Sequence, residues 1–182
     1  MITSPIHTER LLIRPFQITD WPTVALYATD PAVMAFMGEG AQTAAQTQDF
    51  VAQNANGEEV TAYALLLQTT EQLIGHMVFH PWFAPRTYEI GWVIHPDYQR
   101  RGYASEAASA LLRHGFERMK LHRIIATCQP ENPASYGVME KIGMRREGHF
   151  RQCIYRGNDR WWDEYFYALL AEEWQARNNT CS

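Results

Sequence analysis

The sequence has little of what marks exported, membrane-spanning or metal-binding proteins. It holds only three cysteines, Cys128, Cys153 and Cys181, and they show neither CxxC nor metal-ligand spacing. No apolar run approaches the roughly 18 residues of a membrane span, and the first residues, MITSPIHTER, lack the charged start and apolar core of a secretory signal. We therefore expect reduced thiols in a cytoplasmic protein that does not act at a membrane.

Several nucleotide and metal motifs are missing as well. Neither the P-loop pattern GxxxxGK[ST] nor the dinucleotide fingerprint GxGxxG occurs, and the histidines form no HExxH or other paired ligand spacing. The net charge of −4 and the pI near 6.0 disfavour a general polyanion binder, which would carry a basic face. We expect no metal and no nucleic-acid partner.

What is present suits one globular domain. Hydrophobic residues make up 46% of the 182 positions and charged residues 20%, and no linker, repeat or low-complexity segment divides the chain. We expect a single domain over residues 1–182. Hydrophobic periodicity predicts a strand, helices, a three-strand meander, a helix, a strand, a helix and two strands. That order indicates an α/β (α+β) domain with one mixed, mainly antiparallel sheet of about seven strands flanked by helices.

Caps and turn residues set the expected boundaries. One helix is predicted over 19–29 with Thr19 or Asp20 as cap, and a second over 30–37 with Asp30 as cap. The other predicted elements are strands at 9–16, 60–68, 72–80, 86–95, 122–129, 144–156 and 161–170, and helices at 43–56, from about 104 to 120, and at 132–143.

A cationic helix start is the most unusual feature of the sequence. The stretch PDYQRRGYASEA, residues 96–107, puts Arg100 and Arg101 where free N–H groups already make a helix end positive. Gly102 leaves the backbone accessible and Ser105 can donate a hydroxyl hydrogen bond, so the stretch predicts a bound anion such as a phosphate or pyrophosphate. The alternative is a solvated arginine pair at an ordinary helix start.

The same stretch carries a family resemblance. QRRGYA, residues 99–104, resembles the Q/R-x-x-G-x-G/A loop that receives the pyrophosphate of acetyl-CoA in GNAT acyltransferases. TERLLIRPF, EIGWVIHPDYQRRGYASEA, HRIIATCQPENPASYGVMEKIGMRREG and WWDEYFYALL are similar, in order and spacing, to the RimJ/RimL-type branch, which includes ribosomal-protein N-terminal acetyltransferases. The resemblance extends from Thr8 to about Trp174. It implies the GNAT fold, acetyl-CoA as cosubstrate and an N-acetyltransferase activity.

The resemblance also implies roles for cofactor-binding residues. Backbone groups of Trp92, Val93 and Ile94 are expected to bond the pantetheine arm and to polarise the acetyl carbonyl. Asn132 matches an asparagine that bonds this arm or an ordered water, and its alternative role is a loop or cap residue before Pro133. The residues that match the pyrophosphate loop are Gln99, Arg100, Arg101, Gly102, Tyr103, Ala104 and Ser105.

Acetyl transfer to an amine requires a neutral amine, a stabilised oxyanion and a proton for the departing thiolate. Glu89 is the candidate base, because it interrupts an apolar strand and alternation puts it on the face opposite Tyr88, Ile90 and Trp92. Its alternative role is a strand-end glutamate paired with an arginine.

The proton donor departs from the family pattern. Many GNAT enzymes have a tyrosine where VMEKIGM places Met139. Ser135, which matches a serine of the RimJ/RimL branch, is the candidate donor, with Tyr136 as an adjacent alternative. Capping of the helix N-terminus is the competing role for Ser135.

Two functions of different classes follow. The first is an acetyl-CoA-dependent N-acetyltransferase that acts on a primary amine, a protein N-terminus such as that of a ribosomal protein or a small molecule, by direct transfer in a ternary complex. No cysteine lies in a motif for an acyl-enzyme. The second is an inactive acyl-CoA-binding or regulatory module. Acceptor choice is expected between Trp21 and Phe50 and in the loop 81–85, and a homodimer is left open.

Overall fold

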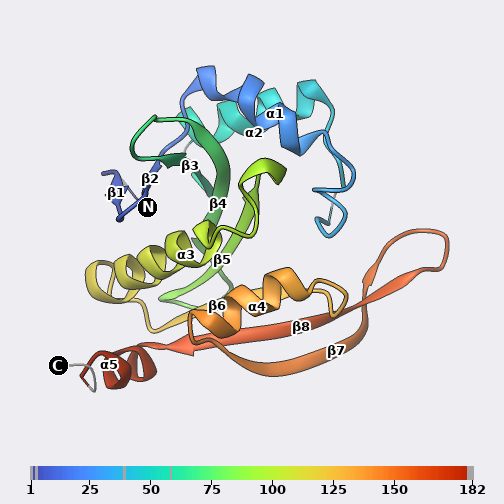
Figure 1. The fold of residues 1–182 in the computed structure, drawn as a ribbon. Helices are drawn as coiled ribbons and strands as arrows, with labels where there is room; N and C mark the ends of the chain where they lie inside the picture. Colours follow the sequence, from blue (N-terminus) through green and yellow to red (C-terminus); the bar gives the residue numbers. More distant parts are fainter. Residues whose placement is uncertain (1, 3, 39, 58, 180–182) are drawn as a thin grey trace. The chain divides into compact units, whose positions relative to one another are not determined.

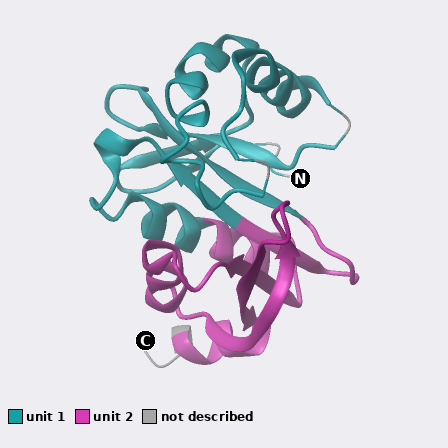
Figure 2. Cartoon of the chain, turned by 90° about the vertical axis from the view of Figure 1, so that its right-hand side faces the viewer, with its two compact units in different colours: residues 1–80, 91–110 teal, residues 81–90, 111–182 magenta. Residues whose placement is uncertain are grey.

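The computed structural model describes residues 2, 4–38, 40–57 and 59–179 of the chain. These residues divide into two compact units (Figure 2), of which the first contains residues 1–80 and 91–110 and the second residues 81–90 and 111–182. Within the described ranges no helix is long and apolar enough to cross a membrane. The expectation of a single domain stays a prediction.

Eight strands form one sheet in the order β1-β2-β3-β4-β5-β6-β8-β7 (Figure 1). The ladder between β5 and β6 is parallel, and those of β1–β2, β2–β3, β3–β4, β6–β8 and β7–β8 are antiparallel. This confirms the expected mixed, mainly antiparallel sheet. The sheet has one strand more than expected, because the two-residue strand β1 was not predicted. The strands are β1 (Ile6–His7), β2 (Leu11–Arg14), β3 (Ala62–Leu67), β4 (Leu73–Pro81), β5 (Thr87–Ile94), β6 (Arg123–Cys128), β7 (Arg145–Tyr155) and β8 (Trp161–Leu170).

The first unit buries its core between β-strands and two helices, α1 (Trp21–Ala28) and α2 (Ala44–Asn56). Helix α2 begins as predicted, because the Thr43 hydroxyl accepts from the Gln46 N–H and the Gln46 side chain accepts from the Thr43 N–H, which is a capping box. Asp20 occupies the N-cap position of α1 without a side-chain cap, since its carboxylate pairs with Arg14 at 2.7 Å.

The prediction of a helix over residues 30–37 is wrong, and the segment forms successive turns. The Asp30 side chain caps the Ala32 N–H at 2.8 Å and the Met34 N–H reaches the Asp30 carbonyl at 3.1 Å, so one helical turn does start. It does not propagate, because a short segment that ends at Gly38 gains too few hydrogen bonds to offset the cost of nucleation.

In the second unit the predicted elements form and one helix was missed. Helix α4 (Pro133–Lys141) stops before Gly143, whose φ of +87° suits a residue without a Cβ. Helix α5 (Ala171–Asn179) follows β8 directly, and its polar composition gave no periodic apolar signal. Helix α3 (Tyr103–Arg113) starts in the first unit and continues as a π-helical turn, η3 (His114–Arg118), which accounts for the predicted helix to about residue 120.

Candidate active site

The end of β5 is held against β4 through a glycine. A Cβ on Gly75 would lie 2.3 Å from the carbonyl oxygen of Val93 and 3.1 Å from the Cα of Ile94, so only glycine lets the two backbones approach this closely. One residue later, the His95 N–H donates to the Ile74 carbonyl at 2.8 Å. The backbone of β5 that is expected to hold the pantetheine arm is therefore fixed from the β4 side.

The parallel ladder between β5 and β6 is shorter than β5 itself. The parallel ladder covers only Thr87, Tyr88 and Glu89 of β5, although β5 continues to Ile94. Within the described residues, the first-unit segment Gly91–Ile94 therefore has backbone groups along one edge that this ladder does not use. An extended chain can bind such an edge as an added strand would.

A short 3-10 turn, η2 (Pro96–Tyr98), leads from β5 into the arginine loop. The His95 side chain caps this turn by accepting from the Asp97 N–H at 3.3 Å. The Gln99 side-chain amide donates to the Ile94 carbonyl at 2.9 Å. Gln99 thus closes the loop onto the end of the strand.

The start of α3 has the geometry of an anion site. Arg100 and Gly102 have positive φ angles of 61° and 81°, which turn the chain sharply into the helix. The first hydrogen bond of the helix runs from the Glu106 N–H to the Gly102 carbonyl at 3.0 Å. Within the described chain no protein acceptor takes the N–H groups of residues 103–105, as is general for the first turn of a helix. Arg100 and Arg101 are exposed beside them.

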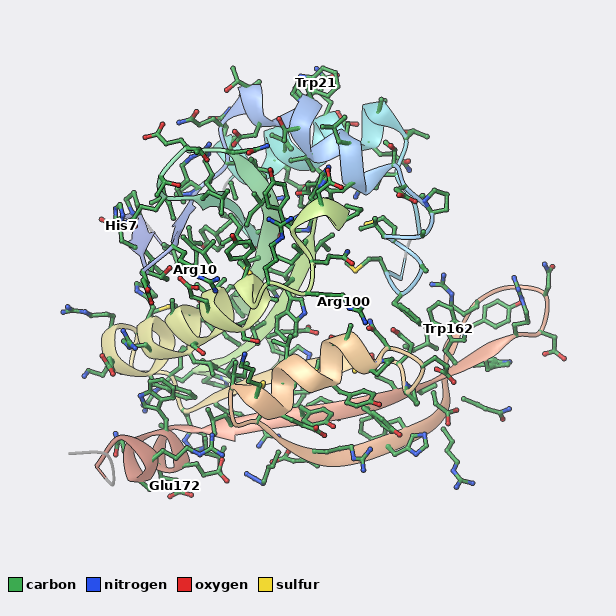
Figure 3. All side chains as sticks on the ribbon, viewed as in Figure 1. His7, Arg10, Trp21, Arg100, Trp162 and Glu172 are labelled. Atoms are coloured by element: carbon green, nitrogen blue, oxygen red, sulfur yellow. The ribbon has the colours of Figure 1, made fainter. Side chains whose placement is uncertain are left out.

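The N-terminal segment before β2 also contacts this helix start, a link that sequence reasoning missed. The Arg10 guanidinium pairs with Glu106 at 2.6 Å, and its Nη1 donates to the Arg101 carbonyl at 3.2 Å. Figure 3 shows the Arg10 side chain lying against α3. Arg10 and Glu106 both lie in the motif stretches quoted above, but a pairing across this sequence distance has no local signal.

In the second unit, Glu89 projects from β5 toward β6. The Thr127 hydroxyl donates to Glu89 Oε1 at 3.5 Å, and both side chains lie on the face of the sheet that carries Ile125, the register partner of Glu89. Phe166 lies on the same face, with Trp82 packed against it at 5.3 Å between ring centroids. The candidate base thus has a hydroxyl partner and aromatic neighbours on its face.

The helix start of α4 is organised by Asn132. Its side-chain oxygen accepts from the Ser135 N–H at 3.2 Å, so Asn132 is the helix cap, and the alternative in which Ser135 caps the helix is wrong. The side-chain oxygen of Asn132 is engaged in this cap, and its NH₂ group is a hydrogen-bond donor.

The Ser135 side chain lies beside Cys128, the last residue of β6. Burial raises the pKa of the Cys128 thiol to about 11, and a hydrogen bond from Ser135 opposes that rise. Consecutive strand residues point to opposite faces, so Thr127 and Cys128 face opposite ways. Glu89 accepts from the Thr127 hydroxyl, and Ser135 lies in the first turn of α4.

A pair of buried polar side chains in the first unit was also not predicted from the sequence. The Tyr27 hydroxyl and His76 Nδ1 are 2.9 Å apart, and both side chains are buried among the rings of Phe16 and Phe50. Burial lowers the pKa of His76 to about 4 and raises that of Tyr27 well above its ordinary value, with the Asp20 charge adding to the latter. This pair is neutral at physiological pH.

Comparisons with known proteins identify a matching family and a similar relative. Residues 10–145 match the family described as an acetyltransferase (GNAT) domain. The chain is 54% identical over 169 residues to the uncharacterized N-acetyltransferase YnaD of Bacillus subtilis (strain 168), a match that covers 93% of this chain and 98% of that protein.

The solved structures with similar folds differ widely in their sequence identity to this chain. The acetyltransferase (GNAT family) from Bacillus anthracis superposes with a TM-score of 0.89 at 54% identity, covering 93% of this chain and 100% of that one. RimL, a ribosomal L7/L12 alpha-N-protein acetyltransferase in complex with coenzyme A, superposes with a TM-score of 0.78 at 21% identity, covering 93% and 99%. At that identity the likeness concerns the fold alone.

Proposed function

The chain belongs to the GNAT acetyltransferase family, and on this premise we propose that it transfers the acetyl group of acetyl-CoA to a primary amine by direct attack in a ternary complex. The amine lone pair forms the new N–C bond, the C–S bond of the thioester breaks, and the departing thiolate takes up a proton. The amine proton passes to a base.

The helix start of α3 carries the cofactor part of the proposal. N–H groups of residues 103–105 point out of the first helical turn, and Arg100 and Arg101 add two exposed positive charges. Pyrophosphate matches this set because it offers several anionic oxygens to several donors at once. This arrangement is the observation on which the proposal chiefly rests.

The edge of Gly91–Ile94 suits the pantetheine arm. The arm is an extended chain with two amide groups, and a strand edge offers N–H and C=O groups at regular spacing. We propose that Trp92, Val93 and Ile94 bind it through their backbone, with Gly75 keeping that backbone in place. The Asn132 NH₂ group is the further proposed donor.

We propose Glu89 as the base, acting directly or through a water. Its carboxylate accepts from the Thr127 hydroxyl, a hydrogen bond that orients the carboxylate. An α-amino group has a pKa of about 7.7 to 8.0, so removing its proton at pH 7 costs about 1 kcal/mol, whereas a lysine with a pKa of about 10.4 requires over about 4 kcal/mol. A protein N-terminus or a small amine of similar basicity is the less demanding acceptor.

The cysteines support direct attack rather than an acyl-enzyme. Burial raises the pKa values of both Cys128 and Cys153, with the charge of Glu164 contributing, and a protonated thiol is a poor nucleophile. Cys181 lies outside the described residues. Thiols without a partner motif also favour a reducing compartment, and we propose the cytoplasm.

Release of the CoA thiol from acetyl-CoA, measured with a panel of N-terminal peptides and small amines, tests this function. Gly102→Glu is expected to abolish cofactor binding, because it sets a carboxylate where the backbone meets phosphate. Two like charges about 4 Å apart repel by about 4 kcal/mol at an effective dielectric of 20, which corresponds to roughly a thousandfold weaker Kd.

Gly157→Glu is the matched control. Gly157 has a similar φ of +76° and open space around its Cβ position, so this variant adds the same charge and the same backbone strain in the β7–β8 hairpin. Unchanged CoA affinity in Gly102→Glu would remove the loop assignment. Tight CoA binding without thiol release from any acceptor would leave a binding module instead of an enzyme.

A further inference from the structure

The contact between the N-terminal segment and α3 is concentrated on one carboxylate. Glu106 Oε1 accepts from the Thr8 hydroxyl at 2.5 Å and from the Arg10 N–H at 2.9 Å, while Oε2 accepts from Arg10 Nε at 2.6 Å. The second guanidinium nitrogen, Nη2, also lies 2.6 Å from Oε2. One glutamate thus takes two side-chain groups and one backbone group from a segment about a hundred residues away in sequence.

Arg10 also lies against the residues on both sides of Gly102. Its Nη1 donates to the Arg101 carbonyl at 3.2 Å, and its guanidinium carbon lies 4.6 Å from the centre of the Tyr103 ring. Between them, a Cβ on Gly102 would lie 3.6 Å from Nη2, which is ordinary van der Waals contact. Arg10 therefore holds the Arg101 carbonyl, which precedes Gly102, and the Tyr103 ring, which follows it.

The charges make this arrangement unusual for an anion site. Glu106 lies in the first turn of α3, where a lone carboxylate would repel a pyrophosphate bound to the preceding N–H groups. Arg10 neutralises it. Burial would raise the pKa of Glu106, but hydrogen bonds from Thr8 and from the backbone and side chain of Arg10 outweigh this and lower it below its ordinary value. The Glu106 carboxylate is therefore negatively charged and paired with Arg10.

We propose that Arg10 and Glu106 are a positioning pair that holds the 100–105 loop in the conformation that binds pyrophosphate before the cofactor arrives. The proposal rests on the function proposed above. All three guanidinium nitrogens of Arg10 face protein oxygens, on Glu106 and on Arg101, so the arginine acts through the loop and does not itself bind phosphate. Ordering the loop in advance removes part of the entropy cost of binding.

Arg10→Lys tests the pair, with Arg14→Lys as its matched control. Both variants keep the positive charge and remove a bidentate fork, and the Arg14–Asp20 pair lies in the same unit without touching the loop. Glu106→Gln is the second variant, which keeps the shape and removes the charge. The readouts are Kd for CoA by calorimetry, KM for acetyl-CoA beside kcat and the amine KM, and amide hydrogen exchange of residues 100–106 in the ligand-free protein.

We expect Arg10→Lys and Glu106→Gln to weaken CoA binding about tenfold, which corresponds to about 1.4 kcal/mol, and to raise the acetyl-CoA KM similarly with little change in kcat. Exchange at 100–106 should be faster in both. Arg14→Lys should lower the urea midpoint and leave Kd and loop exchange unchanged.

The possible failures are distinguishable. Wild-type protein without CoA affinity would overturn the proposed function, while loop exchange in the variants would still decide whether the pair holds the loop. Wild-type affinity and unaltered exchange in Arg10→Lys would overturn the positioning role alone. Weaker binding with unaltered exchange would also overturn it, because Arg10 would then be a direct ligand.

Discussion

Replacing His76 with glutamine is expected to remove about 2 kcal/mol of the loss of stability between pH 7.5 and 5. His76 is 4% exposed, its Nδ1 is bonded to the Tyr27 hydroxyl, and its other neighbours include the rings of Phe16 and Phe50. Burial lowers its pKa from the ordinary 6.5 to about 4. Glutamine can keep a hydrogen bond to Tyr27 but does not titrate.

The sign follows from proton linkage. As the pH falls through 6.5, the unfolded chain protonates at this histidine while the folded chain does not, so the unfolded state gains stability. The loss grows until the pH reaches the folded pKa of about 4 and is constant below it. With these two pKa values, linkage gives a loss of about 2 kcal/mol between pH 7.5 and 5, and about 3 kcal/mol in total.

Urea unfolding at a series of pH values, followed in wild type, His76→Gln and the exposed control His7→Gln, measures this loss. The wild type and His7→Gln should lose about 2 kcal/mol more than His76→Gln between pH 7.5 and 5. Equal pH slopes in wild type and His76→Gln, or an NMR titration of the His76 ring with a midpoint above 6, would refute the reasoning.

Two further predictions concern the chemistry. Glu89→Gln should lower turnover most at low pH, where the neutral amine is scarcest and a base matters most, and an unaltered pH–rate profile would remove Glu89 as the base. Trp82→Ala should raise the KM for the amine several-fold and leave that for acetyl-CoA unchanged, because the partly buried Trp82 packs on the face that carries Glu89. Trp161→Ala, at an exposed tryptophan of the second unit, is the control, and an equal effect of the two variants would contradict the assignment.

Elements with strong local signals were predictable from the sequence. The capping box of α2 and the Gly143 stop of α4 are set within a few residues, and the structure has both. Residues 30–37 had the same kind of signal in Asp30 and Pro31, yet the helix did not extend past its first turn. A cap predicts where a helix can begin, but length and tertiary packing decide whether it continues.

Long-range partners were beyond the sequence. The pairing of Arg10 with Glu106, of Tyr27 with His76 and of Thr127 with Glu89 each joins residues 38 to 96 positions apart. Neither periodicity nor spacing encodes such pairs. The loop motif predicted where an anion could bind, and the structure adds what holds that loop and what faces the candidate base.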